Sequence, residues 1–190
     1  MIEIEKKYRL TKEQQQTVLR RLPEIGAELK ASEFEENTLY AGAGLAPGRS
    51  VLRLRRVGER AILTYKERFP TDSEIKHQRE DETEVSDPHA LDSILTGLGF
   101  TPTLIYEKRR MRWELGAAEI VIDELPFGLF MEIEASEAII EDVEQKLAIT
   151  GLKAEESTYP TLTLEHGKRF GDMVEARFDK DEKTPGGGKP

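Results

Sequence analysis

The sequence opens with MIEIEKKYR at residues 1–9, and the charge pattern of this stretch decides the fold prediction. Glu3, Glu5 and Lys7 are spaced two residues apart, so in an extended strand their side chains share one face. The residues between them, such as Ile4, take the other face. Taken alone, this pattern is typical of an edge strand whose charged face is solvated. An enclosed charged face becomes the better interpretation only if other strands carry charge in the same way.

Seven further segments are predicted to be strands, at residues 33–41, 50–57, 60–67, 76–85, 103–115, 118–125 and 129–135. In SVLRLRRV at 50–57, Arg53 and Arg55 share one face, whereas Leu52 and Leu54 share the other. A turn at Gly58 joins this strand to the next as a hairpin. About eight strands thus combine one apolar face with one charged face.

The charged faces carry both signs, and several strands carry mainly one sign. The basic positions are Lys7, Arg53, Arg55, Lys66, Lys108 and Arg110. The acidic positions are Glu3, Glu5, Glu80, Glu82, Asp123, Glu132 and Glu134. Because Glu80, Glu82 and Glu84 alternate, the register of that strand stays open.

Helices are predicted between groups of strands. Thr11 and Gln14 form a capping-box pattern at the start of the first helix. Asp87, followed by a proline, is predicted to cap the second helix, and Ser136 is predicted to cap a third helix that runs to about residue 150. A short final helix is predicted at 159–168. Residues 1–170 then form one domain, and residues 171–190 are predicted to be a disordered polar tail.

Two folds satisfy these patterns. A flat antiparallel sheet with one solvated face is the simpler solution. The prediction made here is an α+β fold with a closed eight-stranded antiparallel β-barrel, whose charges line a tunnel and whose helices pack on the outside. The separation of the two signs onto different strands favours the tunnel. So does the dominance of arginine, because its rigid fork suits phosphate oxygens.

Composition restricts the class of protein. The chain has 190 residues, no cysteine and a net charge of −9, from 28 basic and 37 acidic residues. This balance argues against nucleic acid or an anionic membrane as partner, and its three histidines lack the paired spacing of a zinc site. No apolar run approaches the roughly 20 residues of a membrane span, and no secretory signal pattern is present. A cytoplasmic location is expected, and a homodimer is left open.

The clustered charges indicate a chemistry. A triphosphate chain needs several cations that converge from different directions, and a buried basic cluster needs a compensating anion. Hydrolysis of a triphosphate also needs Mg²⁺ or Mn²⁺, which prefer carboxylate oxygens and water as ligands. The expected partner is therefore a small molecule that bears a triphosphate.

These residues resemble the CYTH, or triphosphate tunnel metalloenzyme, superfamily. The resemblance covers about residues 1–165 and rests on motifs in family order, which are Glu3-x-Glu5-x-Lys7, Arg53-x-Arg55, Thr64-x-Lys66, Lys108-x-Arg110, Asp123 and Glu132-x-Glu134. The superfamily includes class IV adenylyl cyclases, thiamine triphosphatases and inorganic triphosphatases. The resemblance implies an eight-stranded tunnel, a divalent metal and a triphosphate substrate.

The resemblance also implies roles for individual residues. Phosphate would be bound by Lys7, Arg53, Arg55, Lys66, Lys108 and Arg110. Metal would be held, directly or through water, by Glu3, Glu5, Asp123, Glu132 and Glu134, with Glu80 or Glu82 as a further ligand. Glu3, Glu5 and Lys7 are the expected catalytic residues. Arg56, Arg109 and Arg112 are expected to be surface charges, and Tyr159 is either an anchor for the last helix or an ordinary core residue.

Three functions remain. The first is metal-dependent hydrolysis of inorganic, nucleoside or thiamine triphosphate. The second is a class IV adenylyl cyclase that converts ATP to cyclic AMP and pyrophosphate, which the runs at 106–110 and 123–128 resemble. The third is a non-catalytic polyphosphate-binding module. The hydrolase is preferred because the sequence offers no recognisable adenine pocket.

Overall fold

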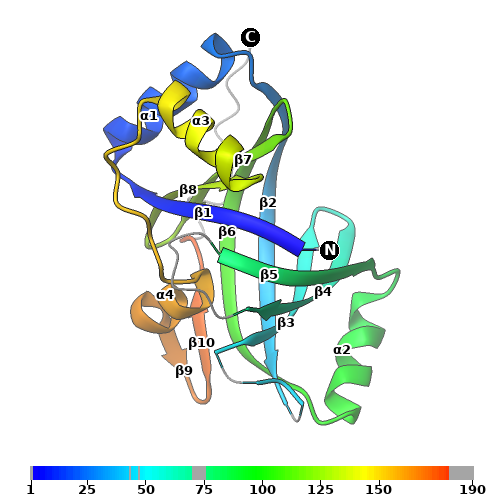
Figure 1. Cartoon of the computed structure of the whole chain (residues 1–190). Coiled ribbons are helices and arrows are strands. Elements are labelled where there is room, and N and C mark those ends of the chain that lie inside the picture. The colour runs from blue at the N-terminus through cyan, green and yellow to red at the C-terminus, as the bar shows by residue number, and fades with distance from the viewer. Residues whose placement is uncertain (1, 43, 47, 70–75, 180–190) are drawn as a thin grey trace.

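The structure is a computed structural model that describes residues 2–42, 44–46, 48–69 and 76–179. It is an α+β fold in which a curled, mainly antiparallel sheet carries four helices within the described residues (Figure 1). The elements in chain order are β1 (Ile2–Leu10), α1 (Lys12–Glu24), β2 (Glu28–Ala41), β3 (Ser50–Val57), β4 (Arg60–Arg68), β5 (Lys76–Glu84), α2 (Pro88–Gly97), β6 (Thr101–Leu115), β7 (Ala118–Leu125), β8 (Gly128–Glu134), α3 (Glu137–Leu147), α4 (Tyr159–His166), β9 (Lys168–Phe170) and β10 (Met173–Ala176).

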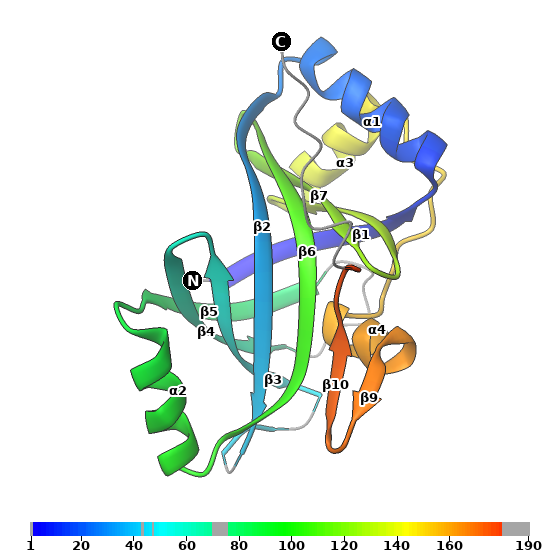
Figure 2. The ribbon, with the colours of Figure 1, turned by 180° about the vertical axis from the view of Figure 1, so that it is seen from behind.

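The sheet is built on two long strands. β2 and β6 pair antiparallel along nearly their full lengths, from Glu28 opposite Glu114 to Ala41 opposite Thr101 (Figure 2). The strand order is β2-β3-β4-β5-β1-β8-β7-β6-β10-β9. β2, the first strand in this order, also pairs with β6, so the sheet curls round. All eight predicted strands are present, so the alternation of charge was a reliable strand signal.

The prediction of a closed barrel was wrong, because the curled sheet forms an open half-barrel. β1 pairs with β5 over only four register positions, from Ile2 to Glu5. Beyond them the edge of β1 is met by the segment before α4, where Tyr8 forms an isolated bridge with Ala154. The Glu155 N–H also donates to the Lys7 carbonyl at 2.7 Å. Because a connecting segment occupies this edge, no strand completes a regular cylinder there within the described residues.

The prediction of disorder from residue 171 onward was wrong for its first part. Met173–Ala176 forms β10, which pairs parallel with β6 and antiparallel with β9. Arg177 contacts Glu36 and the buried Glu107, and the Phe178 N–H donates to Glu107 at 2.9 Å. These contacts are long-range in sequence, so the local polar composition did not reveal them. Residues 180–190 lie outside the described part of the chain.

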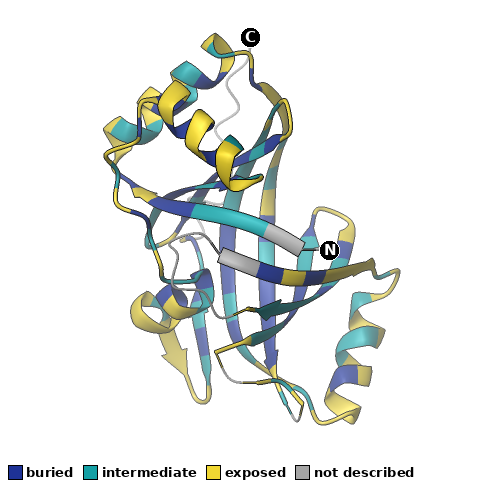
Figure 3. Ribbon diagram, viewed as in Figure 1, coloured by how far each residue is buried: buried dark blue, intermediate teal, exposed yellow. Residues whose placement is uncertain are grey.

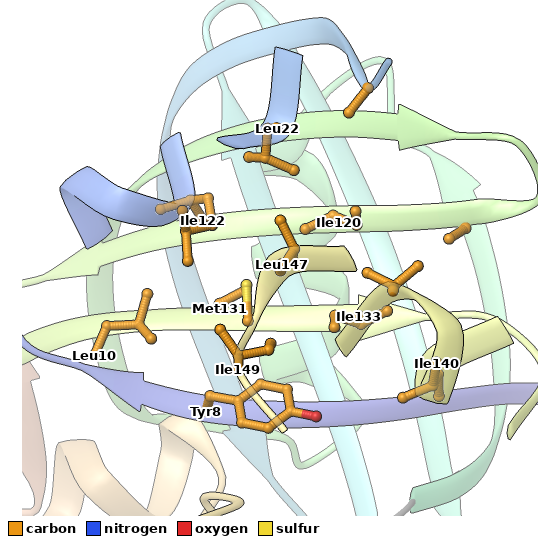
Figure 4. Close-up of a cluster of buried hydrophobic side chains, with 14 residues drawn as sticks. Tyr8, Leu10, Leu22, Ile120, Ile122, Met131, Ile133, Ile140, Leu147 and Ile149 are labelled. Carbon is orange, nitrogen blue, oxygen red and sulfur yellow. The ribbon is translucent and has the colours of Figure 1, made fainter. Parts of the chain in front are cut away.

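The main hydrophobic core lies outside the curled sheet. α1 and α3 cover the outer faces of β1, β7 and β8, and each helix buries one side and exposes the other (Figures 1 and 3). Figure 4 shows this cluster, in which Ile133, Met131 and Ile140 are fully buried. The apolar residues of the strands therefore point toward the helices, which leaves the charged residues for the concave side.

Helix ends follow from local sequence. The predicted capping box of α1 is present, with Gln14 N–H donating to Thr11 Oγ1 at 3.2 Å and Thr11 N–H to Gln14 Oε1 at 2.7 Å. As predicted, Asp87 caps α2. The helix packs on buried residues of β3 and β4. Ser136 makes no side-chain cap bond, which corrects that prediction. None of the helices in the described residues has the length and apolar character needed to span a bilayer.

Candidate active site

The concave side of the sheet encloses a cavity of about 460 Å³, within the range typical of small-molecule sites. All six predicted basic residues line it, namely Lys7, Arg53, Arg55, Lys66, Lys108 and Arg110. Five of the predicted acidic residues also line it, namely Glu5, Glu80, Glu82, Glu132 and Glu134. Asp123 lies behind the wall, and the side chain of Glu3 lies outside the described residues. The structure thus gathers the predicted charges from six strands around one space.

One side of the cavity is formed by the hairpin β3–β4 and its neighbour β5. Arg53 lies 3.5 Å from Glu82 and 3.8 Å from Glu80, and Arg55 lies 2.7 Å from Glu82. Lys66 also contacts Glu80. Both Glu80 and Glu82 therefore face the cavity, which answers the open question of register, and both contact cations.

A second wall contains a dense buried cluster on β6 and β7. Arg110 donates to both oxygens of Asp123, at 2.8 and 2.6 Å, and to Glu132 at 2.9 Å. Lys108, only 1% exposed, lies 3.3 Å from Asp123. Burial would raise the pKa of Asp123, but Arg110 and Lys108 hold that pKa well below its ordinary value. Asp123 is therefore a fixed anion.

Cations crowd one another in this cavity. Burial lowers the pKa of Lys108, and the nearby Arg110 lowers that pKa further. Burial likewise lowers the pKa of Arg55, and the charge of Arg53 adds to this effect. Removing so many cations from water costs free energy even when each has a carboxylate neighbour. A polyanionic ligand would offset that cost.

The third wall carries Lys7 on β1 and the acidic residues of β8. Lys7 is 2% exposed and stands opposite Glu132 in the strand register. Glu5 stands opposite Glu134, and both line the cavity. Two carboxylates directly opposite on neighbouring antiparallel strands repel each other. A bound cation would relieve that repulsion.

Among the side chains that the structure describes, the predicted metal ligands other than Asp123 line the cavity without forming one compact cluster. Within the described part of the chain, no three carboxylate or histidine side chains come close enough to share a metal ion. Asp123 accepts hydrogen bonds from Lys108 and Arg110. Glu5 and Glu134 supply the hard oxygen donors that Mg²⁺ and Mn²⁺ prefer, and Glu3 precedes Glu5 by two residues on the same strand. The donor chemistry at this end of the cavity fits such an ion.

Glu35 on β2 is a cavity residue that the sequence analysis missed. It is 1% exposed and lies 3.3 Å from Lys108 and 3.9 Å from both Arg55 and Arg110. Burial would raise its pKa, but Lys108, Arg110 and Arg55 together lower the pKa of Glu35 to about 2. The alternation of Glu33 and Glu35 carried the signal, but the adjacent Glu36 masked it.

The residues expected at the surface divide into two groups. Arg56 pairs with Glu36 and Arg109 with Glu124, both on the outer face, as predicted. Arg112 is also a paired charge, with Glu119 at 3.3 Å and a side chain that is 42% exposed, but unlike the other two it lies at the cavity lining. Tyr159 also lines the cavity, and its hydroxyl donates to Asp123 at 2.8 Å.

Solved structures share this fold. The PH1012 protein from Pyrococcus horikoshii OT3 has a TM-score of 0.72 and 26% identity, over 83% of this chain and 96% of that chain. HpAC1 from Hippeastrum, a proposed adenylyl cyclase with a dominant triphosphatase activity, has a TM-score of 0.66 and 22% identity, over 85% of this chain and 94% of that one. A proposed adenylate cyclase from Vibrio parahaemolyticus has a TM-score of 0.65 and 21% identity, over 84% and 95%.

Sequence comparison gives the family. No curated protein matches the chain. The family model of the CYTH domain matches residues 1–166, which include every charged strand that lines the cavity. The two likenesses below 25% identity show the fold alone, whereas the family match covers most of the sequence. The chain therefore belongs to the CYTH domain family.

Proposed function

We propose that this protein is a metal-dependent triphosphatase that cleaves a triphosphate-bearing small molecule inside the charged cavity. The observation that carries this proposal is the convergence of six basic side chains from β1, β3, β4 and β6 on one space of about 460 Å³. A linear triphosphate presents oxygens along its length and needs cations on several sides. A single phosphate or carboxylate would need fewer.

The cations proposed to bind phosphate project from different strands. Arg53 and Arg55 project from β3, and Lys108 and Arg110 project from β6. The two pairs flank Glu35 of β2, which lies 3.9 Å from both Arg55 and Arg110. Arginine forks would bind phosphate oxygens in a bidentate manner, and the buried Lys7 would add a point charge. Charge that develops in phosphoryl transfer is stabilised by donors already in place. The carboxylates that now pair with these cations hold them in position before substrate enters.

The proposed metal site lies at the β1 and β8 end of the cavity. Glu5 and Glu134, together with Glu3, would hold Mg²⁺ or Mn²⁺ through carboxylate oxygens. When bound, such an ion supplies Lewis-acid polarisation of a phosphoryl oxygen. The resemblance to tunnel metalloenzymes supports this assignment, and both Glu5 and Glu134 line the cavity.

The aromatic residues of the cavity favour a triphosphatase over an adenylyl cyclase. The aromatic side chains that line the described cavity are Tyr106 and Tyr159, which are 2% and 7% exposed. Neither presents an open ring face on which an adenine could stack, and a cyclase must position the ATP ribose as well as the phosphates. Class IV adenylyl cyclase remains the second candidate because HpAC1 bears a cyclase name alongside its triphosphatase activity. A non-catalytic polyphosphate-binding module is the third.

Analysis of the reaction products distinguishes the triphosphatase, the cyclase and the binding module. The protein is incubated with Mg²⁺ or Mn²⁺ and with tripolyphosphate, ATP or thiamine triphosphate, and orthophosphate, pyrophosphate and cyclic AMP are measured. Orthophosphate from tripolyphosphate is the expected result. Pyrophosphate together with cyclic AMP would establish the cyclase instead. Tight binding of all three compounds without turnover would favour the binding module.

A further inference from the structure

Tyr159 lies at the meeting point of α4 and the charged cavity. It is the first residue of α4 and is 7% exposed. Its hydroxyl donates to Asp123 Oδ2 at 2.8 Å. Burial raises the pKa of Tyr159 well above its ordinary value, and the charge of Asp123 raises that pKa further. The phenol therefore stays protonated and serves as a permanent donor.

Asp123 connects Tyr159 to the cations. Its Oδ1 accepts from Arg110 Nε at 2.8 Å, and its Oδ2 accepts from Arg110 Nη2 at 2.6 Å, Lys108 Nζ at 3.3 Å and the Tyr159 hydroxyl. A carboxylate with several donors in place has little freedom to rotate. The phenol is the one neutral donor among them, so it restrains the carboxylate without adding a competing charge.

The ring of Tyr159 makes a second set of contacts. The ammonium of Lys7 lies 4.4 Å from the ring centroid, and that of Lys108 lies 5.3 Å from it. Both distances fall within cation–π range, and the contacts are largely removed from water because each lysine is no more than 2% exposed. One side chain from α4 thus contacts cations of β1 and β6.

α4 is itself fixed from outside the sheet. The Tyr159 carbonyl accepts from Thr163 Oγ1 at 2.7 Å, and Tyr159, Leu162 and Ala176 of β10 share one buried cluster. A β-carbon on Gly167, just after α4, would lie 2.7 Å from the Val174 side chain and 2.9 Å from the Glu175 carbonyl, so the chain approaches β10 closely there. The C-terminal strand therefore supports the helix that carries Tyr159.

We propose that Tyr159 is a positioning residue of the phosphate site, which acts through Asp123 to hold Lys108 and Arg110, and through its ring to hold Lys7, in the arrangement that receives a polyphosphate. This inference rests on the proposed function, since it assumes that these cations bind phosphate. Tyr159 itself is not a catalytic residue.

Tyr40 supplies a matched control. Its hydroxyl donates to Asp92 at 2.7 Å, and Tyr40 is 5% exposed, so its burial and its tyrosine–aspartate hydrogen bond resemble those of Tyr159. Tyr40 belongs to the cluster under α2 and does not line the cavity. Tyr40→Phe therefore removes a comparable hydrogen bond with no route to the cations.

The test is calorimetric titration with tripolyphosphate in the absence of metal, on the wild type, Tyr159→Phe and Tyr40→Phe, with thermal unfolding recorded for each. Loss of a hydrogen bond to a charged group predicts an affinity about tenfold weaker in Tyr159→Phe, with wild-type affinity in Tyr40→Phe. Unchanged affinity in Tyr159→Phe would overturn the inference. A wild type that binds no tripolyphosphate would overturn the proposed function, and this inference with it.

A double-variant cycle tests the route through Asp123. If Tyr159 acts mainly by orienting that carboxylate, adding Tyr159→Phe to Asp123→Asn weakens binding by less than about twofold beyond Asp123→Asn alone. Full additivity of the two losses would contradict the route. The Nε–H resonance of Arg110, assigned with Arg110→Lys, gives a ligand-free readout, and its shift should change in Tyr159→Phe and not in Tyr40→Phe.

Discussion

The two faces of β8 present opposite chemistry within a few residues. Met131 and Ile133 are fully buried against α3 in the apolar cluster of Figure 4, whereas Glu132 and Glu134 line the cavity. Many proteins solvate the charged face of a sheet and bury the apolar face. Here the sheet curls so that its charged face is enclosed and its apolar face is covered by helices. Stability and proposed activity therefore reside on opposite sides of the same strands.

The largest expected effect is on the cavity side. Arg53→Ala should lower kcat/KM for tripolyphosphate by about 10²–10³, because a charge-stabilising donor is lost. The fold should persist, since the carboxylates near Arg53 keep other cation partners in Lys66 and Arg55. Steady-state kinetics with a thermal unfolding curve provide the measurement.

Arg56→Ala is the matched control for this change. Arg56 follows Arg55 on the same strand but pairs with Glu36 at 3.5 Å outside the cavity. The Arg56→Ala variant should therefore retain the wild-type kcat/KM for tripolyphosphate. Equal losses in Arg53→Ala and Arg56→Ala would mean that the two faces do not differ in function.

The next effect is on the core side. Ile133→Ala should lower the free energy of unfolding by about 4 kcal/mol, because it leaves a cavity in a fully buried cluster. Activity per folded molecule should stay near the wild-type value at low temperature. Urea titration measures the first quantity, and Ile133→Val, which removes one methyl group, should cost only about 1 kcal/mol.

Glu35 tests how the enclosed charges contribute to stability. Its pKa is lowered from 4.5 to about 2, so its contribution is fully present above pH 4.5 and is lost as pH falls toward 2. The shift corresponds to a contribution on the order of 3 kcal/mol. Glu35→Gln should therefore flatten the decline in unfolding free energy between pH 4.5 and 2. An identical decline in both proteins would show that Glu35 is not held in its charged form.

The smallest expected effect is at the surface. Lys146 pairs with Asp142 at 2.6 Å one turn earlier on α3, and both side chains are about half exposed. Lys146→Ala should cost about 0.3–0.5 kcal/mol and leave kinetics unchanged. A loss of more than about 1 kcal/mol in the free energy of unfolding, measured by urea titration, would show that this surface ion pair contributes more to stability than expected.

Local periodicity predicted most of the sheet, because the alternation of charge in β1, β3 and β6 follows directly from strand geometry. It could not predict β10, since the pairing of Val174 with Leu104 joins residues far apart in the sequence. It also grouped Asp123 with the residues that line the cavity, because spacing identifies the face of a strand and says nothing of depth. Only the packing of Arg110 and Tyr159 around Asp123 shows that it lies behind the cavity wall.

The central claim is that the enclosed charged face receives a triphosphate. A crystal structure of the protein with tripolyphosphate tests it directly. The expected result is phosphate oxygens in contact with Arg53 and Arg55 of β3 and with Lys108 and Arg110 of β6. Tripolyphosphate bound only on the outer surface, with the ion pairs of the cavity intact, would contradict it.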